Sequence, residues 1–428
     1  MVLEGEYPEG IEELEMEIER LEKAEIVPPE EMPGRMERKP LAEIKSRISR
    51  ILGTTTKKIA LSIIIALLIL VGSLSLMMYL PPEKEWIKIH GGSSYEGGDS
   101  IFIYDGYIYV AGHTFSFGNG ESDAWLLKYN LDGDLVWNIT WGGSDDDWAE
   151  GVFVYGSNIY VTGYTRSFSI DYNIFVLKYD LDGNLIWSHI WGWGSDDHSM
   201  DIFVYDNYIY VVGYTESLGA GSADIYLLKF DLDGNLLWNV TWGGNNWDVG
   251  SDIFVYDNNI YVVGSTESRG AGKWDVCLLK FDLDGNLIWN ITWGGKDDDG
   301  GTSIFIYNNY IYLVGSTYSF GAGESDICLL KYRLDGTKVR EITWGGASWD
   351  YSQDIFVYSD SIYIVGDTRS FGAGGSDICL LKYSNAGMGV RICRVLVLVS
   401  SIYIVVVIVY IIRLFRIKKI SSRPYKIY

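Results

Sequence analysis

The chain contains little cysteine, four residues in 428. Three of them, Cys277, Cys328 and Cys379, occupy one position in successive copies of an internal repeat, and neighbouring copies place that position beyond disulfide reach. The fourth, Cys393, lies beside an apolar run near the C-terminus. The sequence therefore excludes a disulfide framework, and the three repeated cysteines are interpreted as small buried apolar residues.

Histidine is equally scarce, and basic residues are outnumbered, with 34 Lys and Arg against 57 Asp and Glu. The four histidines show no metal-ligand spacing, so no metal site is predicted from them. An acidic chain argues against nucleic acid as a partner, because phosphates are bound by Lys and Arg. Neither a serine nucleophile elbow nor a phosphate-binding loop occurs. The histidines are His90, His113, His189 and His198, and His198 lies in an outward loop where it breaks the symmetry of the repeat.

The chain does contain one sequence repeat that occurs six times, and residues 201–250 form one copy of it. A fixed period of this kind indicates repeated supersecondary units that stack on one another. The closing motif of each copy opens with one residue, and these residues are 50 or 51 apart: His90, Trp141, Trp191, Trp242, Trp293 and Trp344.

Each copy holds four short runs rich in β-branched and aromatic residues, which in the copy at 201–250 are 202–205, 208–214, 224–230 and 236–242. Such runs, separated by Asp, Asn and Gly, predict strands. The connections are too short for crossover helices, so each copy is an antiparallel meander. We therefore predict an all-β fold, a six-bladed β-propeller of four-stranded blades over residues 83–385. Trp238 and Trp242 share one strand face and are expected to fill the gap to the next blade.

The strand count places the sixth outer strand first in the chain, at Glu85–Ile89, with Trp86 in the place of Trp238. An N-terminal outer strand can complete the last blade, close the ring and remove a free sheet edge. Residues 385–394 are the rival for that place, because they align as a degenerate outer strand without the tryptophan pair.

A family resemblance rests on the repeat text itself. The pattern Gly-x-Thr-x-Ser-x-Gly-x-Gly-x-x-Asp, followed by Leu-Leu-Lys-Phe/Tyr-x-x-x-Gly-x-x-x-Trp, resembles the SBBP-type β-propeller repeat and, more distantly, the PQQ-like repeat. The resemblance covers about residues 85–384 and implies a scaffold without a defined chemistry. The chain departs from it in having six copies where the SBBP repeat is named for seven, and in lacking residues to hold a quinone.

The termini differ from the repeats. Residues 1–40 carry 13 Glu against five Lys or Arg, with Ile11, Leu14, Ile18 and Leu21 at helical spacing, which predicts an acidic amphipathic helix. It is either a solvated helix or a partner-binding one. Residues 41–58 form a basic amphipathic segment, which is typical of an interfacial helix attracted to membrane lipid.

Two apolar runs are long enough to cross a bilayer, residues 59–80 and 395–412. Basic residues precede the first run and follow the second in the tail 413–428, so both termini are expected in the cytoplasm. We therefore predict a two-pass cell-membrane protein with an extracellular propeller. Since the runs flank the propeller at one seam, the rim of short turns should face the membrane and the long loops should face away.

The outward loops contain the candidate binding residues. Each connection between blades has an acid in one column, with acids, tryptophans or a histidine beside it, and carboxylates next to exposed aromatic rings suit sugars or cations. The alternative is that a residue repeated in every blade fixes a turn by hydrogen bonds. The candidates are Glu96, Asp146, Asp147, Trp148, Asp196, Asp197, His198, Trp247, Asp248, Asp298, Asp299, Trp349 and Asp350.

Two further patterns are weaker. Asp231-Leu-Asp-Gly-Asn235 resembles half of a calcium loop, but Trp242 stands where an EF-hand needs an acid, so a hairpin turn is favoured over calcium. No cofactor is predicted beyond that possibility of Ca²⁺. Three acceptor patterns for N-glycosylation fall on outer strands, at Asn138, Asn239 and Asn290.

These observations favour a binding or interaction module over an enzyme, with a carbohydrate, cation or protein partner. An extracellular glycan-active enzyme using rim carboxylates is the second hypothesis, and it should show one off-pattern cleft with a perturbed carboxylate. A transmembrane sensor or scaffold that recruits a partner through residues 1–40 is the third.

Overall fold

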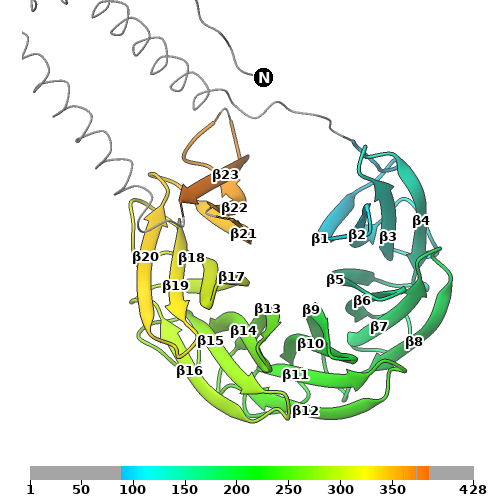
Figure 1. Cartoon of the computed structure of the whole chain (residues 1–428), viewed down its shortest axis with the longest axis horizontal. Coiled ribbons are helices and arrows are strands. Elements are labelled where there is room, and N and C mark those ends of the chain that lie inside the picture. The colour runs from blue at the N-terminus through cyan, green and yellow to red at the C-terminus, as the bar shows by residue number, and fades with distance from the viewer. Residues whose placement is uncertain (1–87, 360, 373, 385–428) are drawn as a thin grey trace, which may run out of the picture. The chain divides into compact units, whose positions relative to one another are not determined.

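The structure is a computed structural model that describes residues 88–384, apart from 360 and 373. The described residues form 23 strands in six antiparallel sheets, five of four strands and one of three. The sheets follow one another in chain order as the blades of a propeller, with β1, β5, β9, β13, β17 and β21 innermost (Figure 1). The prediction of an all-β, six-bladed propeller is confirmed.

The strand boundaries repeat closely from blade to blade. The first three blades are β1 (Glu96–Tyr104), β2 (Tyr107–Thr114), β3 (Asp123–Asn130) and β4 (Leu135–Trp141); β5 (Asp147–Tyr155), β6 (Asn158–Thr165), β7 (Asn173–Asp180) and β8 (Leu185–Trp191); β9 (Asp197–Tyr205), β10 (Tyr208–Thr215), β11 (Asp224–Asp231) and β12 (Leu236–Trp242). The last three are β13 (Asp248–Tyr256), β14 (Asn259–Thr266), β15 (Asp275–Asp282) and β16 (Leu287–Trp293); β17 (Asp299–Tyr307), β18 (Tyr310–Thr317), β19 (Asp326–Arg333) and β20 (Lys338–Trp344); β21 (Asp350–Tyr358), β22 (Ser361–Thr368) and β23 (Asp377–Ser384).

Tight turns join the two inner strands of each blade. Between β9 and β10 the turn residues Asp206 and Asn207 have φ of 51° and 64°. Two successive residues in the left-handed region define the type I′ hairpin turn, which matches the twist of paired strands and favours Asp, Asn and Gly. The two-residue Asp-Asn turn therefore sets the register between the two inner strands of the blade.

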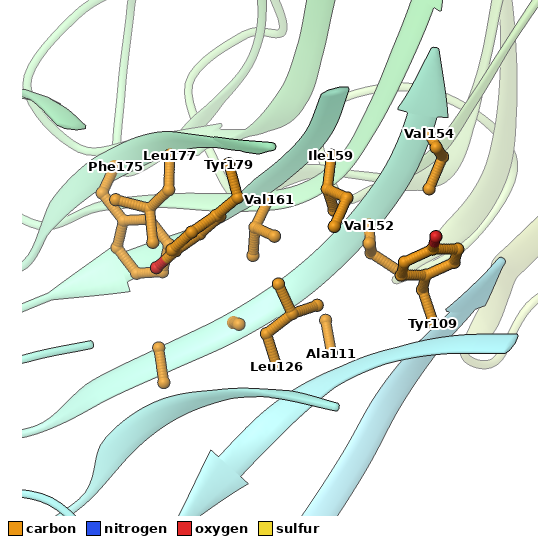
Figure 2. Packing of buried hydrophobic residues seen from close by; sticks show 12 residues of the cluster. Tyr109, Ala111, Leu126, Val152, Val154, Ile159, Val161, Phe175, Leu177 and Tyr179 are labelled. Atoms are coloured by element: carbon orange, nitrogen blue, oxygen red, sulfur yellow. The ribbon is translucent and has the colours of Figure 1, made fainter. Parts of the chain in front are cut away.

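Neighbouring blades pack face to face. Figure 2 shows the contact between the first two blades, in which Tyr109, Ala111 and Leu126 lie against Val152, Val154, Ile159, Val161, Phe175, Leu177 and Tyr179. Equivalent clusters fill the next four contacts. Both faces of a middle blade are thus buried, which explains why its strands are apolar almost throughout. Trp238 and Trp242 join the cluster between the third and fourth blades, as predicted.

Two polar features also tie blade to blade. The amine of Lys229 on β11 lies over the rings of Tyr208 and Tyr210 and donates a 2.9 Å hydrogen bond to the carbonyl of Leu283 in the next blade. Lys128, Lys178 and Lys280 make the same bond to the blade that follows each of them. The buried lysine is satisfied by a carbonyl and by aromatic faces.

Within the described part of the chain the sixth sheet has three strands, in the order β21-β22-β23. Residues 88–90 are in no strand, and 85–87 lie outside the described residues, so the closing strand at Glu85–Ile89 stays a prediction. Residues 385–394 and the segments 1–40, 41–58, 59–80, 395–412 and 413–428 also lie outside them. No helix of the described residues has the length and hydropathy of a membrane span.

Candidate functional site

Two sets of connections meet at one rim of the propeller, which we call the loop rim. They are the connections between blades, such as 142–146, and those between the second and third strands of a blade, such as 166–172. Backbone hydrogen bonds join the two sets: Arg166 donates to the carbonyl of Asp146, and Glu216 to that of Asp196. The loop rim is therefore an ordered surface held by the blades.

The repeated acid column lies at the base of this rim, where each of its aspartates is at most 1% exposed. Asp147 accepts hydrogen bonds from Thr165, from Ser167 at 2.6 Å and from the backbone N–H of Gly143 at 2.8 Å. The same bonds from a threonine hydroxyl and a loop N–H reach Asp197, Asp248, Asp299 and Asp350. These carboxylates pin the loops, and their role in binding a ligand stays a prediction.

Glu96 holds the same place in the first blade and accepts bonds from Gly92 and Thr114. The candidates directly before and after the acid column are the accessible ones. Asp146, Trp148, Asp196, His198 and Asp298 are partly exposed, and Trp247 and Trp349 are 36% and 37% exposed.

In the second and third blades, and at the edge of the first, the rim departs from the repeat. Five rings from the β1–β2, β5–β6 and β9–β10 hairpins form a continuous row, which we call the aromatic cluster. The cross-strand pairs are Gly97 and His113, Trp148 and Tyr164, and His198 and Tyr214. In the other three blades these positions hold Val249 and Ser265, Gly300 and Ser316, and Tyr351 and Asp367.

The cluster rings contact one another along the row, stacked at most contacts and tilted between Tyr164 and His198. The ring centroids of His113 and Trp148 are 3.8 Å apart, and those of Tyr164 and His198 are 4.2 Å apart. His198 is also stacked on Tyr214, with centroids 4.8 Å apart. The row is flanked by rings that keep much of their surface accessible: Tyr95 at 65%, Phe115 at 39% and Trp247 at 36%.

Two carboxyl groups lie beside the cluster, Asp99 and Glu150. Each is the extra residue of a β-bulge on an innermost strand, where the register skips one residue. A bulge re-aims a side chain out of the regular alternation. The same position holds Met200, Ser251, Thr302 and Gln353 in the other blades, so these two acids belong to the asymmetric part of the rim.

Glu150 is the perturbed carboxyl of this region. Burial raises its pKa to about 7, the neighbouring Asp99 adds to the effect, and a hydrogen bond with Tyr164 opposes it. Close to neutral pH this side chain is therefore divided between the acid, which can donate a proton, and the carboxylate, which can accept one.

The two histidines of the cluster differ. His113 is 2% exposed, and its Nδ1 lies 3.0 Å from Oδ2 of Asp99, while its Nε2 is buried without a hydrogen-bond partner. The Asp99 carboxylate favours a proton on Nδ1, which leaves Nε2 as an acceptor. Burial lowers the pKa of His198 to about 4, so that ring is neutral at physiological pH.

Three carboxylates come close together elsewhere on the rim, those of Glu121, Asp145 and Asp146, all within 4.8 Å of one another. Asp146 also accepts a 2.7 Å bond from Ser122. These three carboxylates could bind a cation, but exposed acidic groups of this kind are common without one. The Asp231–Asn235 segment is a hairpin turn in which Asp231 accepts bonds from the backbone of Asp233 and Asn235.

The glycosylation candidates Asn138, Asn239 and Asn290 lie on the outermost strands β4, β12 and β16, and all three are exposed. Asn138 accepts a 3.2 Å bond from the indole of Trp125. A sugar attached at any of them would project from the edge of the propeller, away from the loop rim.

The sequence singled out His198 as a break in the repeat, and the structure places it in the aromatic cluster with Trp148. Five residues of this region were not predicted from the sequence: His113, Tyr164, Tyr214, Asp99 and Glu150. A column-by-column comparison of the six copies would have found the first three, because Ser or Asp replaces them in the later blades. The bulge column holds a different residue in every copy, so the two acids do not stand out in it.

Comparison with known proteins supports the fold. A family described as a domain of unknown function (DUF5122) β-propeller matches residues 105–135. The chain is a β-propeller. No curated protein matches it.

Among solved structures, the propeller is similar to the subtype N11 neuraminidase-like protein of A/flat-faced bat/Peru (H18N11), with 12% identity, a TM-score of 0.40, and coverage of 66% of this chain and 85% of that one. It is also similar to the phage phi92 endosialidase, with 11% identity, a TM-score of 0.44, and coverage of 70% and 68%. Likenesses of this strength say nothing about what the propeller binds.

Proposed function

We propose that the propeller is a binding module and that its ligand is a carbohydrate held on the aromatic-cluster side of the loop rim. The observation that carries the proposal is the asymmetry of the rim. The threonine-to-aspartate hydrogen bond of the acid column repeats in the second to sixth blades, whereas the row from His113 to Tyr214 occurs once, with small or aliphatic residues at most of the matching positions.

The chemistry of this surface suits a sugar. Exposed faces of Tyr95, Phe115 and Trp247 offer flat apolar area to the C–H face of a pyranose. The partly exposed carboxylates of Asp146 and Asp196 can accept hydrogen bonds from hydroxyl groups. Contacts with the rings of the aromatic cluster keep the exposed rings in place, so little side-chain entropy is lost on binding.

The test is a glycan-binding screen with the full chain, followed by affinity measurements on the best ligand. Trp247→Ala and Tyr95→Ala should each weaken binding about fivefold, since one stacked ring contributes on the order of 1 kcal/mol. Tyr318→Ala is the matched control, because Tyr318 is 37% exposed on the same rim in the fifth blade, away from the cluster. Equal effects at all three positions, or no glycan bound, would contradict the proposal.

A second candidate is a glycan-active enzyme, favoured by one specific observation. Glycoside hydrolysis uses two carboxyl groups, one with a raised pKa, and Glu150 has a pKa of about 7 with Asp99 acting on it. Incubation with a panel of chromogenic glycosides distinguishes the two. An enzyme would lose turnover in Glu150→Gln and keep glycan affinity, whereas a binding module shows no turnover in either protein.

Cation and protein partners are further readings of the same acidic rim. A calcium titration of the full chain, with Asp146→Asn as the variant, tests the cation. The scaffold hypothesis concerns residues 1–40 and is tested separately, by deleting them and looking for loss of a co-purifying protein.

The location and the repeat type are also part of the proposal. Residues 59–80 and 395–412 would tether the propeller to the cell membrane as a two-pass protein, with both termini in the cytoplasm and the propeller outside. The repeat is assigned to the SBBP-type, PQQ-like group on the motif it shares with them. Protease protection in sealed vesicles tests the orientation. Protease added outside the vesicles cleaves the propeller only if the propeller lies on the outer face of the vesicle membrane.

A further inference from the structure

The charges of the loop rim are distributed as unevenly as its aromatic rings. Its connections within residues 115–223 carry six acidic residues and one basic residue, whereas those within 243–376 carry four of each. The aromatic-cluster side of the rim is therefore anionic, and the opposite side is balanced. On the cluster side the charged residues are Glu121, Asp145, Asp146, Asp171, Asp196 and Glu216 against Arg166. On the opposite side they are Glu267, Asp297, Asp298 and Glu324 against Arg269, Lys273, Lys296 and Arg369.

The basic residue of the cluster side shows how a cation is held there. The guanidinium of Arg166 lies 5.7 Å from the ring centroid of Tyr172, and the neighbouring charge of Asp145 raises the pKa of Arg166. An aromatic face with a carboxylate beside it attracts guanidinium and ammonium groups, because the ring face and the acid are both negative. The same combination of ring and acid occurs at both ends of the aromatic cluster.

At the Trp247 end of the cluster, Tyr214 has three carboxylates near it. Burial, followed by their charges, raises the pKa of Tyr214 to about 12. The three belong to Glu216, Asp196 and Glu150. Burial, followed by the charge of Asp196, also raises the pKa of Glu216. Trp247 is exposed beside Tyr214, with ring centroids 5.9 Å apart. A cation placed on this indole would relieve the repulsion among the acids.

The Tyr95 end combines the same groups with an unpaired acceptor. The exposed ring of Tyr95 is stacked on His113, with centroids 5.6 Å apart, and Oδ2 of Asp99 lies 3.0 Å from Nδ1 of His113. Since Asp99 favours the proton on Nδ1, the buried Nε2 of His113 is an acceptor, and among the described residues it has no donor. This end of the cluster therefore also suits a ligand that brings N–H donors and positive charge.

We propose that the aromatic-cluster side of the loop rim selects a carbohydrate with a positively charged amino group, namely an unacetylated 2-amino sugar. The inference rests on the proposed function, because it names the class of sugar that the same surface takes. The sugar lies on the ring of Trp247 or Tyr95, and its ammonium group donates hydrogen bonds to the carboxylates beside that ring. A neutral sugar would leave these acids without a counter-charge, and an acidic sugar would be repelled by them.

The test uses three tetrasaccharides with the same β-linked backbone, which differ only in the group on C2. The glucosamine tetramer carries an ammonium group there, the N-acetylglucosamine tetramer an acetamide, and cellotetraose a hydroxyl. Calorimetric titration of the full chain is made at about pH 6, where an amine that titrates near the pKa of an α-amino group is charged. The glucosamine tetramer should bind about tenfold more tightly than the other two. Added salt should reduce this advantage, because it screens exposed charges.

A pair of variants separates the charge from the stacking. Glu216→Gln keeps the size of the side chain and removes its charge, so it should weaken binding of the glucosamine tetramer about threefold and leave the affinity for cellotetraose unchanged. Glu324→Gln is the matched control, because Glu324 is an exposed acid of the same rim in the fifth blade. It should change neither affinity.

The outcomes distinguish the inference from the function on which it rests. Equal affinities for the glucosamine tetramer and cellotetraose would overturn the selection of an amino sugar and leave a carbohydrate-binding module standing. Equal losses in Glu216→Gln and Glu324→Gln would also overturn it, because the net charge of the protein and not the cluster side would then attract the ligand. If none of the three sugars nor any glycan of the wider screen binds, the proposed function fails, and the inference fails with it.

Discussion

At the scale of single residues, the rim shows how a repeated acid is used. Asp248 is fully buried and accepts hydrogen bonds from Thr266 and from the backbone N–H of Gly244 at 2.8 Å. Each bond to a charged acceptor contributes about 1.5–3 kcal/mol when its loss leaves a buried donor unpaired. The carboxylate therefore stabilises the loop that enters the fourth blade.

We predict that Asp248→Ala lowers the free energy of unfolding by about 3 kcal/mol, because the buried hydroxyl of Thr266 and the half-buried N–H of Gly244 lose their acceptor. Chemical denaturation of the full chain measures the change. Asp298→Ala is the control, since this partly exposed acid lies 3.8 Å from Lys273 at the surface, and an exposed ion pair contributes at most about 1 kcal/mol. Equal losses in both variants would show that the column has no special structural role.

How far such residues could be predicted from the sequence depends on what fixes them. Asp248 was found because it recurs in a column, and His198 because it breaks the pattern. Glu150 was not found, since its position depends on a β-bulge that skips one residue of β5. A bulge is a property of strand pairing, and the residues before and after it carry no mark of it.

At the scale of strands, a line of side chains on the innermost strands connects successive blades. Oδ2 of Asp201 on β9 accepts a 3.2 Å bond from the backbone N–H of Ile253 on β13. Oδ2 of Asp252 accepts a 2.7 Å bond from Ile304 on β17 and a 2.8 Å bond from the hydroxyl of Ser303. Each innermost strand is thereby held to the next by a side chain.

Two of these acids face each other. Asp201 and Asp252 are hydrogen-bonded together, and although both keep some accessible surface, protein atoms surround their carboxyl groups. Burial, followed by the charge of Asp252, raises the pKa of Asp201 well above its ordinary value. Burial also raises the pKa of Asp252, and Asp354 adds to it. The pair therefore holds a shared proton most readily at low pH.

The direction of the pH effect follows from that shift. A carboxyl whose pKa is higher in the folded than in the unfolded protein stabilises the fold at low pH and loses that contribution as the pH rises through the folded value. We predict that Asp201→Asn raises the melting temperature by a few degrees at pH 8 and has a smaller effect at pH 5. The amide still accepts from Ile253 and can donate to Asp252 without a charge.

Thermal melts across that pH range measure the effect, and Asp233→Asn is the control. Asp233 is an exposed acid of an outer turn, so its removal changes the net charge equally without touching the pair. A pH dependence that is the same in Asp201→Asn and the parent chain would contradict the interpretation of a shared proton.

The strands themselves were predictable because the repeat text carries their ends. The Asp-Asn and Asp-Gly turns stop each run, and the residues between them are apolar on both faces. The fourth strand of the last blade is the element whose partner the sequence could only suggest. Two stretches far apart in the chain, 85–89 and 385–394, align with it. The choice between them depends on which one pairs with β23, and local sequence does not determine this.

At the scale of the whole molecule, the two ends of the described chain leave from one rim. Lys88 lies at the turn between β3 and β4, where its amine is 2.8 Å from Asp134. Ser384 ends β23 opposite Ser361, beside the turn between β21 and β22. Both turns belong to the rim of short turns, opposite the loop rim. The apolar run 59–80 ends about ten residues before Lys88, and the run 395–412 begins about ten residues after Ser384.

A propeller tethered through both exits would lie with its short turns towards the bilayer and its loop rim towards the solvent. We predict that a fluorophore attached at Asp233→Cys, on an outer turn, is quenched strongly by nitroxide-labelled lipid headgroups in vesicles that carry the full chain. The same fluorophore at Ser144→Cys, on the loop rim, should be quenched weakly. Both side chains are exposed, so labelling is comparable once Cys393 is replaced by Ser.

Equal quenching at the two sites would contradict a fixed orientation. Stronger quenching at position 144 would mean that the aromatic cluster faces the membrane, where it could not bind soluble glycans.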